Sequence, residues 1–94
     1  MVPDDPIIIP ITDELDLHTF APRETPLVVE AYLEACRGRK IYRVRIIHGK
    51  GTGTLRETVH SCLRGLPFVR SYHLGNETNG SWGATIVTLS QDPQ

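Results

Sequence analysis

The sequence predicts an α/β fold, a two-layer sandwich in which a mixed sheet carries both helices on one face. Apolar residues alternate with a period of two in four segments, as in strands, and recur at helical spacing in two others. Along the 94 residues the order is strand, helix, strand, helix, strand, strand. The two helical crossovers predict a partly parallel sheet with right-handed connections. The last two strands, Val69–Leu74 and Ala84–Leu89, are joined by a polar loop, which predicts an antiparallel hairpin.

The chain begins with residues 1–13, which we expect to form an extended N-terminal arm. Three prolines bracket the isoleucine run Ile7–Ile9, and proline cannot donate to the ladder of a central strand. We expect the isoleucine side chains to pack against the surface of the domain, which residues 14–90 form. Residues 91–94 are a C-terminal tail.

The first strand and the first helix have clear local signals. Leu15–His18 alternates with a period of two, which places Asp16 and His18 on one strand face about 7 Å apart, at about 3.3 Å per residue. Thr25, followed by proline, is a good N-cap, and Gly38 is expected to end the helix. The apolar face of this helix is formed by Val28, Val29, Tyr32, Ala35 and Cys36.

The second strand, Tyr42–Ile47, leads through a glycine-rich turn into the second helix. The pattern Thr54–Glu57 matches a capping box at the start of that helix. Gly65 and Pro67 end the helix. Its apolar stripe consists of Leu55, Val59, Cys62, Leu63 and Leu66.

The net charge of −1 conceals an uneven distribution. Residues 1–36 carry eight acidic residues and one basic residue, whereas residues 37–70 carry nine basic residues and one acidic residue. A basic middle is the electrostatic footprint of a polyanion binder. These charges could equally solvate the surface and pair with the acidic first third, so the charge alone leaves both interpretations open.

Cysteine content and hydropathy indicate a soluble, cytoplasmic protein. Cys36 and Cys62 are too few for a disulfide scaffold and fall on apolar helix faces, so we expect buried free thiols. The longest aliphatic run, Ile7–Ile9, is too short for a signal sequence or a membrane span. We expect no membrane contact, and the sequence leaves the oligomeric state open.

The glycine-rich turn His48–Gly53 is the strongest local signal for a binding site. Its three alternating glycines let the backbone approach a ligand closely, and the free N–H groups at the start of the next helix attract anions. The turn matches neither the Walker A loop nor the dinucleotide fingerprint, which argues against mononucleotide binding. The alternative is a connection that needs glycine only for its turn. The residues expected to hold a phosphate are Gly49, Lys50, Gly51, Gly53 and Arg56.

Three polar residues are expected to be catalytic. Asp16 and His18 end the first strand, His48 ends the second, and ligands in open α/β sheets bind at the carboxyl ends of strands. If these strands are neighbours, the three side chains meet on one small surface. Asp16 can then orient a histidine and raise its basicity. A solvated strand face would explain Asp16 and His18 equally well.

The other histidines and the tryptophan carry weaker signals. His60 falls on the polar side of the second helix and is expected at the surface, and His73 lies on the third strand. No C-x-x-C or H-x-x-x-H pair exists, so a structural zinc site is not expected. Trp82 lies in the turn before the last strand, where it either covers the end of the core or stacks on a base.

Three motifs resemble those of the Smr (small MutS-related) domain family. They are L-D-L-H at Leu15–His18, H-G-K-G-x-G-x-L-R at His48–Arg56 and G-A-T-x-V at Gly83–Val87. Their order and spacing match the family from about residue 14 to residue 89. Smr domains occur fused to MutS-like ATPases, fused to plant RNA-binding repeat proteins and as short stand-alone proteins, and this chain resembles the last kind.

The resemblance implies a fold similar to the C-terminal domain of a bacterial translation initiation factor. It also implies endonuclease activity on DNA or RNA, including mRNA on stalled ribosomes. Carried over by position, Asp16 and His18 match the D-x-H motif, and His48–Gly53 matches the H-G-x-G loop. The implied partner is nucleic acid, with the ribosome as one setting, and the alternative is a non-catalytic module that binds nucleic acid or ribosomes. A divalent cation such as Mg²⁺ is compatible with these residues, but nothing in the sequence requires a cofactor.

Two positions depart from the family pattern. Thr19 follows L-D-L-H where the family usually has glycine, and Asn79–Gly83 replaces the first part of the usual G-G-x-G-A-T sequence. The first departure lies at the edge of the expected site. The second lies in the hairpin that precedes the last strand.

Overall fold

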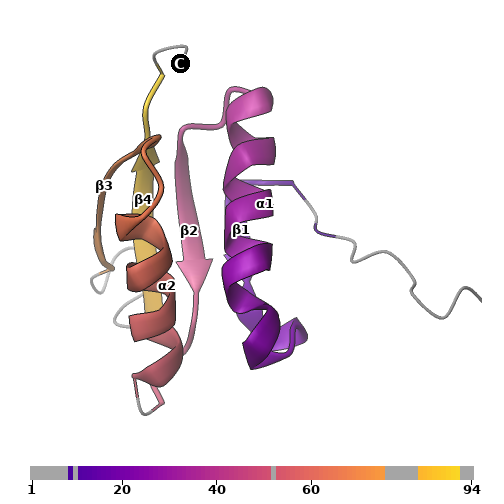
Figure 1. The fold of residues 1–94 in the computed structure, drawn as a ribbon, viewed down its shortest axis with the longest axis vertical. Helices are drawn as coiled ribbons and strands as arrows, with labels where there is room; N and C mark the ends of the chain where they lie inside the picture. Colours follow the sequence, from indigo (N-terminus) through magenta and orange to yellow (C-terminus); the bar gives the residue numbers. More distant parts are fainter. Residues whose placement is uncertain (1–8, 10, 52, 76–82, 92–94) are drawn as a thin grey trace, which may run out of the picture.

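A computed structural model describes residues 9, 11–51, 53–75 and 83–91 and has the predicted α/β architecture (Figure 1). Within these ranges, one sheet has the strand order β1-β2-β4-β3. The parallel pair is β1 with β2, and β4 is antiparallel to both of its neighbours, β2 and β3. The mixed sheet and the antiparallel hairpin are therefore confirmed. The strands are β1 (Glu14–Asp16), β2 (Arg43–Ile47), β3 (Val69–Leu74) and β4 (Ala84–Leu89).

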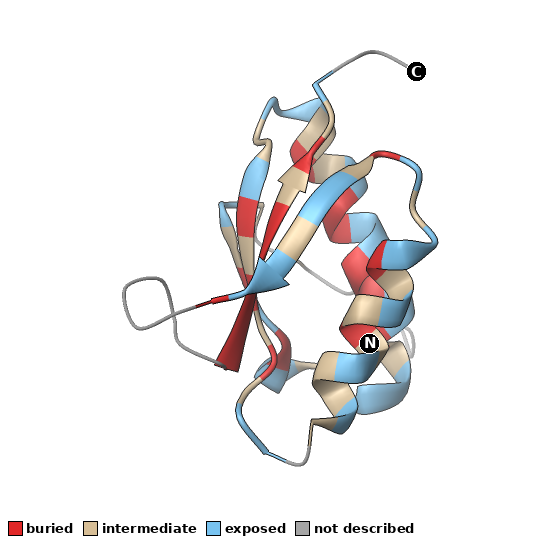
Figure 2. Cartoon of the chain, turned by 90° about the vertical axis from the view of Figure 1, so that its left-hand side faces the viewer, coloured by how far each residue is buried: buried red, intermediate tan, exposed pale blue. Residues whose placement is uncertain are grey.

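Two helices, α1 (Thr25–Gly38) and α2 (Thr54–Arg64), cover the same face of the sheet (Figures 1 and 2). Two short 3₁₀ helices, η1 (Leu17–Thr19) and η2 (Pro22–Glu24), connect β1 to α1. Figure 2 shows that the buried residues of the helices turn toward the sheet. In the described part of the chain, neither helix has the length and hydrophobicity needed to span a membrane.

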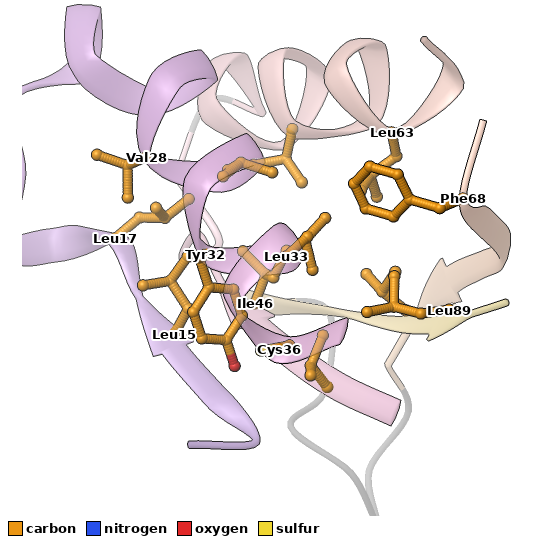
Figure 3. Packing of buried hydrophobic residues seen from close by; sticks show 14 residues of the cluster. Leu15, Leu17, Val28, Tyr32, Leu33, Cys36, Ile46, Leu63, Phe68 and Leu89 are labelled. Carbon is orange, nitrogen blue, oxygen red and sulfur yellow. The ribbon is translucent and has the colours of Figure 1, made fainter. Parts of the chain in front are cut away.

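The hydrophobic core lies between the sheet and the helices (Figure 3). Tyr32 is its largest fully buried side chain, and its hydroxyl group donates a hydrogen bond to the carbonyl oxygen of Thr12. Ile9 and Ile11 pack against the core, as expected for the arm. The rest of the predicted arm lies outside the described residues. The core consists of Leu15, Leu17, Val28, Val29, Tyr32, Leu33, Cys36, Val44, Ile46, Val59, Leu63, Phe68, Val87 and Leu89.

The first strand ends two residues earlier than predicted. The side chain of Asp16 accepts a hydrogen bond from the backbone amide of His18 at 2.9 Å, and this bond turns the chain into η1. A short polar side chain that bonds to nearby backbone competes with the strand ladder in this way. The prediction that Asp16 and His18 share a strand face 7 Å apart is therefore wrong.

The starts of both helices differ from the prediction by one residue. The N-cap of α1 is Glu24, and Thr25 is the first helical residue with a buried side chain. The N-cap of α2 is Gly53, whose carbonyl oxygen accepts the amide of Glu57 at 2.9 Å. Because the N-cap is a glycine, the capping box predicted from Thr54 does not form.

Helix α1 ends at Gly38 as predicted, but its C-terminal turn uses another residue. The amide of Ile41 donates to the carbonyl of Cys36 at 2.8 Å, and the amide of Lys40 donates to the carbonyl of Arg37 at 3.0 Å. These are the two bonds of a Schellman motif, which needs one left-handed residue, usually glycine. Lys40 takes that conformation with a φ of 62°.

Candidate active site

The turn after β2 is held against the start of β4. The backbone amides of His48 and Gly49 both donate to the carbonyl oxygen of Gly83, at 2.9 and 2.8 Å. A Cβ atom at Gly83 would lie 3.4 Å from Cγ of Lys50 and 3.6 Å from Cα of Gly49. These are ordinary van der Waals distances, so the two hydrogen bonds to its carbonyl oxygen are what join Gly83 to the turn.

His18 lies against the same turn. Asp16 pairs with Ile47 in the parallel register, so β1 and β2 end side by side. Gly49 has a φ of 84°, and a Cβ atom there would lie 3.0 Å from Nε2 of His18. The structure thus brings the Asp16–His18 pair and the glycine-rich turn to one surface.

Asp16 and His18 form a hydrogen-bonded pair that faces solvent. Nδ1 of His18 lies 2.7 Å from Oδ1 of Asp16, and their side chains are 61% and 52% exposed. The backbone amide of His18, with a smaller contribution from its ring, holds the pKa of Asp16 below its ordinary value. An ionised carboxylate only accepts hydrogen bonds, so Nδ1 of His18 carries a hydrogen, and in the neutral ring the lone pair is on Nε2.

His48 has a different environment, because it is buried under the turn. It is 5% exposed. Its Nδ1 lies 3.0 Å from the carbonyl oxygen of Gly49, and its Nε2 lies 2.8 Å from Oγ1 of Thr85. Both ring nitrogens are therefore engaged within the protein.

His60 belongs to the same network, and the expectation that it lies on the surface is wrong. Its Nε2 also lies 2.8 Å from Oγ1 of Thr85, so one hydroxyl group connects two histidines. The ring of His60 packs against Tyr72 and meets His48 edge-on, with centroid distances of 5.0 and 6.2 Å. The sequence does contain a signal for this network, since Thr85 is a polar residue in the apolar strand Ala84–Leu89 and needs a buried partner.

The carbonyl oxygen of Gly49 determines which group donates in each hydrogen bond of this network. Burial lowers the pKa of His48 and of His60, so both rings are neutral near pH 7. The Gly49 carbonyl only accepts, so Nδ1 of His48 donates to it and Nε2 is left as an acceptor. The Thr85 hydroxyl must donate its one hydrogen to that nitrogen, and it accepts the Nε2–H of His60.

A cavity of about 240 Å³ opens between the turn, the first turn of α2 and Pro22. His48 contributes to its lining. The guanidinium group of Arg56 lies close over Gly53, where a Cβ atom would come within 2.7 Å of Nη2. A Cβ atom at Gly51 would meet nothing within 4 Å, so the backbone there is open to an approaching group.

The described ranges contain no group of three histidine, cysteine, aspartate or glutamate side chains arranged as metal ligands. Cys36 and Cys62 are free thiols, the first buried and the second half-buried. The predicted roles of Trp82 fall outside the described residues.

Comparisons with known proteins identify similar sequences and folds. Residues 15–90 match the model of the Smr domain family. The chain is 42% identical over 80 residues to endonuclease MutS2 of Pelotomaculum thermopropionicum and 40% identical over 77 residues to that of Lachnospira eligens. These alignments cover 85% and 82% of this chain but 10% of each relative, so the chain spans about a tenth of their length.

Two solved structures share the fold. The Smr domain of Thermus thermophilus MutS2 superposes with a TM-score of 0.77 at 34% identity, covering 87% of this chain and all of that one. YdaL of Escherichia coli, a stand-alone small MutS-related protein, superposes with a TM-score of 0.71 at 25% identity. That second match covers 86% of this chain and 66% of YdaL.

Replacing Thr85 tests the histidine network. Thr85→Val keeps the shape of the side chain but leaves two buried ring nitrogens without their partner, which should cost about 1–3 kcal/mol of unfolding free energy. Thr85→Ser keeps the hydroxyl group and should restore the ring ¹⁵N NMR shifts of His48. Urea unfolding and imidazole NMR spectra of the two variants give the measurement. Identical His48 spectra for the two variants would show that the hydroxyl group does not set the ring's hydrogen bonds.

Stability should decrease as the pH is lowered from about 7.5 to about 5.5. The unfolded chain protonates its imidazoles near their ordinary pKa of about 6.5, whereas burial lowers the pKa of His48 and His60 in the fold. In this range the unfolded state binds more protons than the folded state, so the free energy of unfolding decreases as the pH decreases. Denaturant titrations across the range provide the test. The decrease should be smaller for His60→Gln, whose amide can still donate to Thr85 but does not titrate, and a stability that rises toward low pH would contradict the assignment.

Proposed function

The chain belongs to the Smr domain family, and on that premise we propose that it binds nucleic acid at the His48–Gly53 turn and cleaves phosphodiester bonds there as an endonuclease. One observation carries the proposal. An exposed imidazole, His18, oriented by the carboxylate of Asp16, lies against a glycine-rich turn at the N-terminus of α2. The substrate is DNA or RNA, with ribosome-bound RNA among the candidates. The free thiols of Cys36 and Cys62 suit a cytoplasmic location.

The phosphate group would bind between the turn and the start of α2. The amides in the first turn of a helix have no intrahelical partner and attract anions. Lys50 and Arg56 add positive charge, and the open backbone at Gly51 lets a phosphate oxygen come close. The cavity of about 240 Å³ is smaller than the roughly 300–1,000 Å³ of sites that enclose small ligands. It therefore suits one unit of a polymer better than an enclosed metabolite.

In the proposed mechanism His18 is the general base. Asp16 accepts a hydrogen bond from Nδ1–H, which leaves Nε2 of His18 to remove a proton from the nucleophile, either water or the 2′-hydroxyl group of RNA. The oxygen of the nucleophile forms a bond to phosphorus while the P–O bond to the leaving sugar oxygen breaks, and solvent protonates that leaving oxygen. Lys50 and the amides of the turn stabilise the negative charge that develops on the phosphoryl oxygens. His48, with both ring nitrogens bonded, acts by fixing the position of Gly49. Its role is thus positioning, beside the catalytic role of His18.

A non-catalytic nucleic-acid-binding module is the second candidate, and the burial of His48 favours it. General acid and general base catalysis by two histidines needs both rings at the substrate, yet His18 is exposed while His48 is 5% exposed. Such a module would bind nucleic acid at the same surface without cleaving it.

Cleavage should depend on His18 and Asp16. His18→Ala should reduce the cleavage rate by about 100-fold or more, the typical contribution of a general base, and Asp16→Asn should reduce it in the same direction because the ring loses its orientation. The assay uses labelled single- and double-stranded DNA and RNA, each with Mg²⁺ and with EDTA.

His73→Ala is the matched control, since His73 is exposed on β3 and outside the proposed site. If Asp16 ligates a metal, wild-type activity should be lost in EDTA, and activity that persists in EDTA would leave Asp16 the orienting role alone. Wild-type cleavage by folded His18→Ala would refute the mechanism, and unchanged binding without product from the wild-type protein would establish the second candidate.

Binding of a short substrate should depend on Lys50. Removal of one phosphate contact should reduce the slope of log affinity against log salt by about one. The probe is a DNA hairpin with a stem of about four base pairs, followed by fluorescence anisotropy. Arg64→Ala, at the other end of α2, should leave this short probe's affinity unchanged. Equal losses for Lys50→Ala and Arg64→Ala would mean that the turn is not the phosphate site.

A further inference from the structure

Most of the basic residues of segment 37–70 gather at the end of the molecule opposite the glycine-rich turn. Helices α1 and α2 both run toward the end at which β2 and β3 begin (Figure 1). The residues at this end define what we name the distal basic surface. They are Arg37, Arg39, Lys40, Arg43, Arg64 and Arg70.

Contacts between the elements place these residues at one end of the molecule. The guanidinium group of Arg37 stacks on the ring of Phe68, 4.6 Å from its centroid, which joins the end of α1 to the turn before β3. At the start of β2, Arg43 pairs with Thr88 of β4. At the start of β3, Val69 pairs with Leu89 of β4. The starts of β2 and β3 therefore flank the end of β4, with the helix ends above them.

The described acidic residues do not balance the charge at this surface. Among the described residues, one arginine forms an ion pair with an acidic residue, namely Arg45 with Glu14. Arg45 is not one of the six basic residues of the distal basic surface. Glu34 is the acidic residue of α1 nearest to this end, one turn before Gly38. The C-termini of two helices contribute about half a negative charge each. Counting only the described residues, the surface keeps a net charge of roughly +4 after these corrections.

Helix-end stabilisation alone does not account for these cations. Basic residues in the last turn complement the helix dipole, and Arg37 and Arg64 occupy such positions. The other four lie beyond the last turns, and all four are exposed. An exposed, unpaired cluster of this kind attracts a polyanion.

We propose that the distal basic surface is a second nucleic-acid contact, which binds the phosphate backbone of a duplex while the glycine-rich turn binds the same duplex elsewhere. The inference rests on the proposed function in taking the turn as the first contact. The 11 residues of α2 separate the two contacts by about 17 Å, at about 1.5 Å per residue. This distance corresponds to about five base steps of 3.4 Å each. A duplex of fewer than about five base pairs is therefore too short to reach both.

The test compares two DNA hairpins, with stems of about four and about fourteen base pairs, on the full chain. Affinity is measured by fluorescence anisotropy from about 50 to about 200 mM salt. A longer stem offers more overlapping sites, which raises the affinity but leaves the salt slope unchanged. Simultaneous contact instead makes the slope steeper, by about 0.9 for each added phosphate contact. We expect the long hairpin's slope to exceed that of the short one by about two to four.

The variant for this test replaces three exposed arginines, Arg39, Arg43 and Arg70, with alanine. Arg37 is retained because it packs on Phe68, and Lys40 because of its backbone conformation. The triple variant should lose about two to three from the slope on the long hairpin and nothing on the short one. The matched triple lysine variant keeps the charge and should behave as the wild type, since phosphate contacts need charge alone.

The outcomes separate this inference from the proposed site at the turn. Equal salt slopes for the two hairpins, or a triple alanine variant with the wild-type slope on the long hairpin, overturn the distal contact. Lys50→Ala without effect on the short hairpin overturns the turn as the phosphate site but leaves the slope difference as support for the distal surface. A slope difference that the triple alanine variant abolishes and the triple lysine variant keeps establishes the second contact.

Discussion

The hydroxyl group of Thr85 connects the buried sheet to the candidate site. It donates its hydrogen to Nε2 of His48 and accepts the Nε2–H of His60, while His48 holds the carbonyl of Gly49. Two residues earlier, the Gly83 carbonyl accepts the amides of His48 and Gly49. The turn that faces His18 is thus attached to β4, which is paired on both sides and cannot shift without breaking two ladders.

Two histidines of the candidate site, His18 and His48, differ in burial and therefore in the groups that their ring nitrogens can contact. His18 is exposed and hydrogen-bonded to one carboxylate, so its Nε2 faces solvent, as the proposed general base requires. His48 is enclosed, and both of its nitrogens are satisfied, so it serves the geometry of the turn. The two motifs that contain these histidines therefore meet at one site, but the two rings have different environments there.

The sequence predicted the elements well and the contacts between side chains less well. The periodicity of apolar residues depends on burial, so it placed all four strands, both helices and the hairpin to within a few residues. The end of β1 was misplaced because the Asp16 carboxylate captures an amide two residues ahead, a local bond that period-two alternation does not register. His60 was assigned to the surface because its partner, Thr85, lies 25 residues away in the chain. The gathering of cations at one end also depends on the directions of two helices and two strands, which the local pattern does not contain.

Lys40 links the stability of its left-handed turn to the charge of the distal basic surface. A side chain in that conformation costs roughly 1–2 kcal/mol relative to glycine, and a Schellman motif accepts glycine most readily. The chain nevertheless has a cation there, beside other cations whose repulsion adds to the cost. Lys40→Gly would relieve the strain of this turn and increase thermal stability. The same substitution would remove one positive charge from the distal basic surface. At this one position, the most stable turn and the most positively charged surface therefore require different residues.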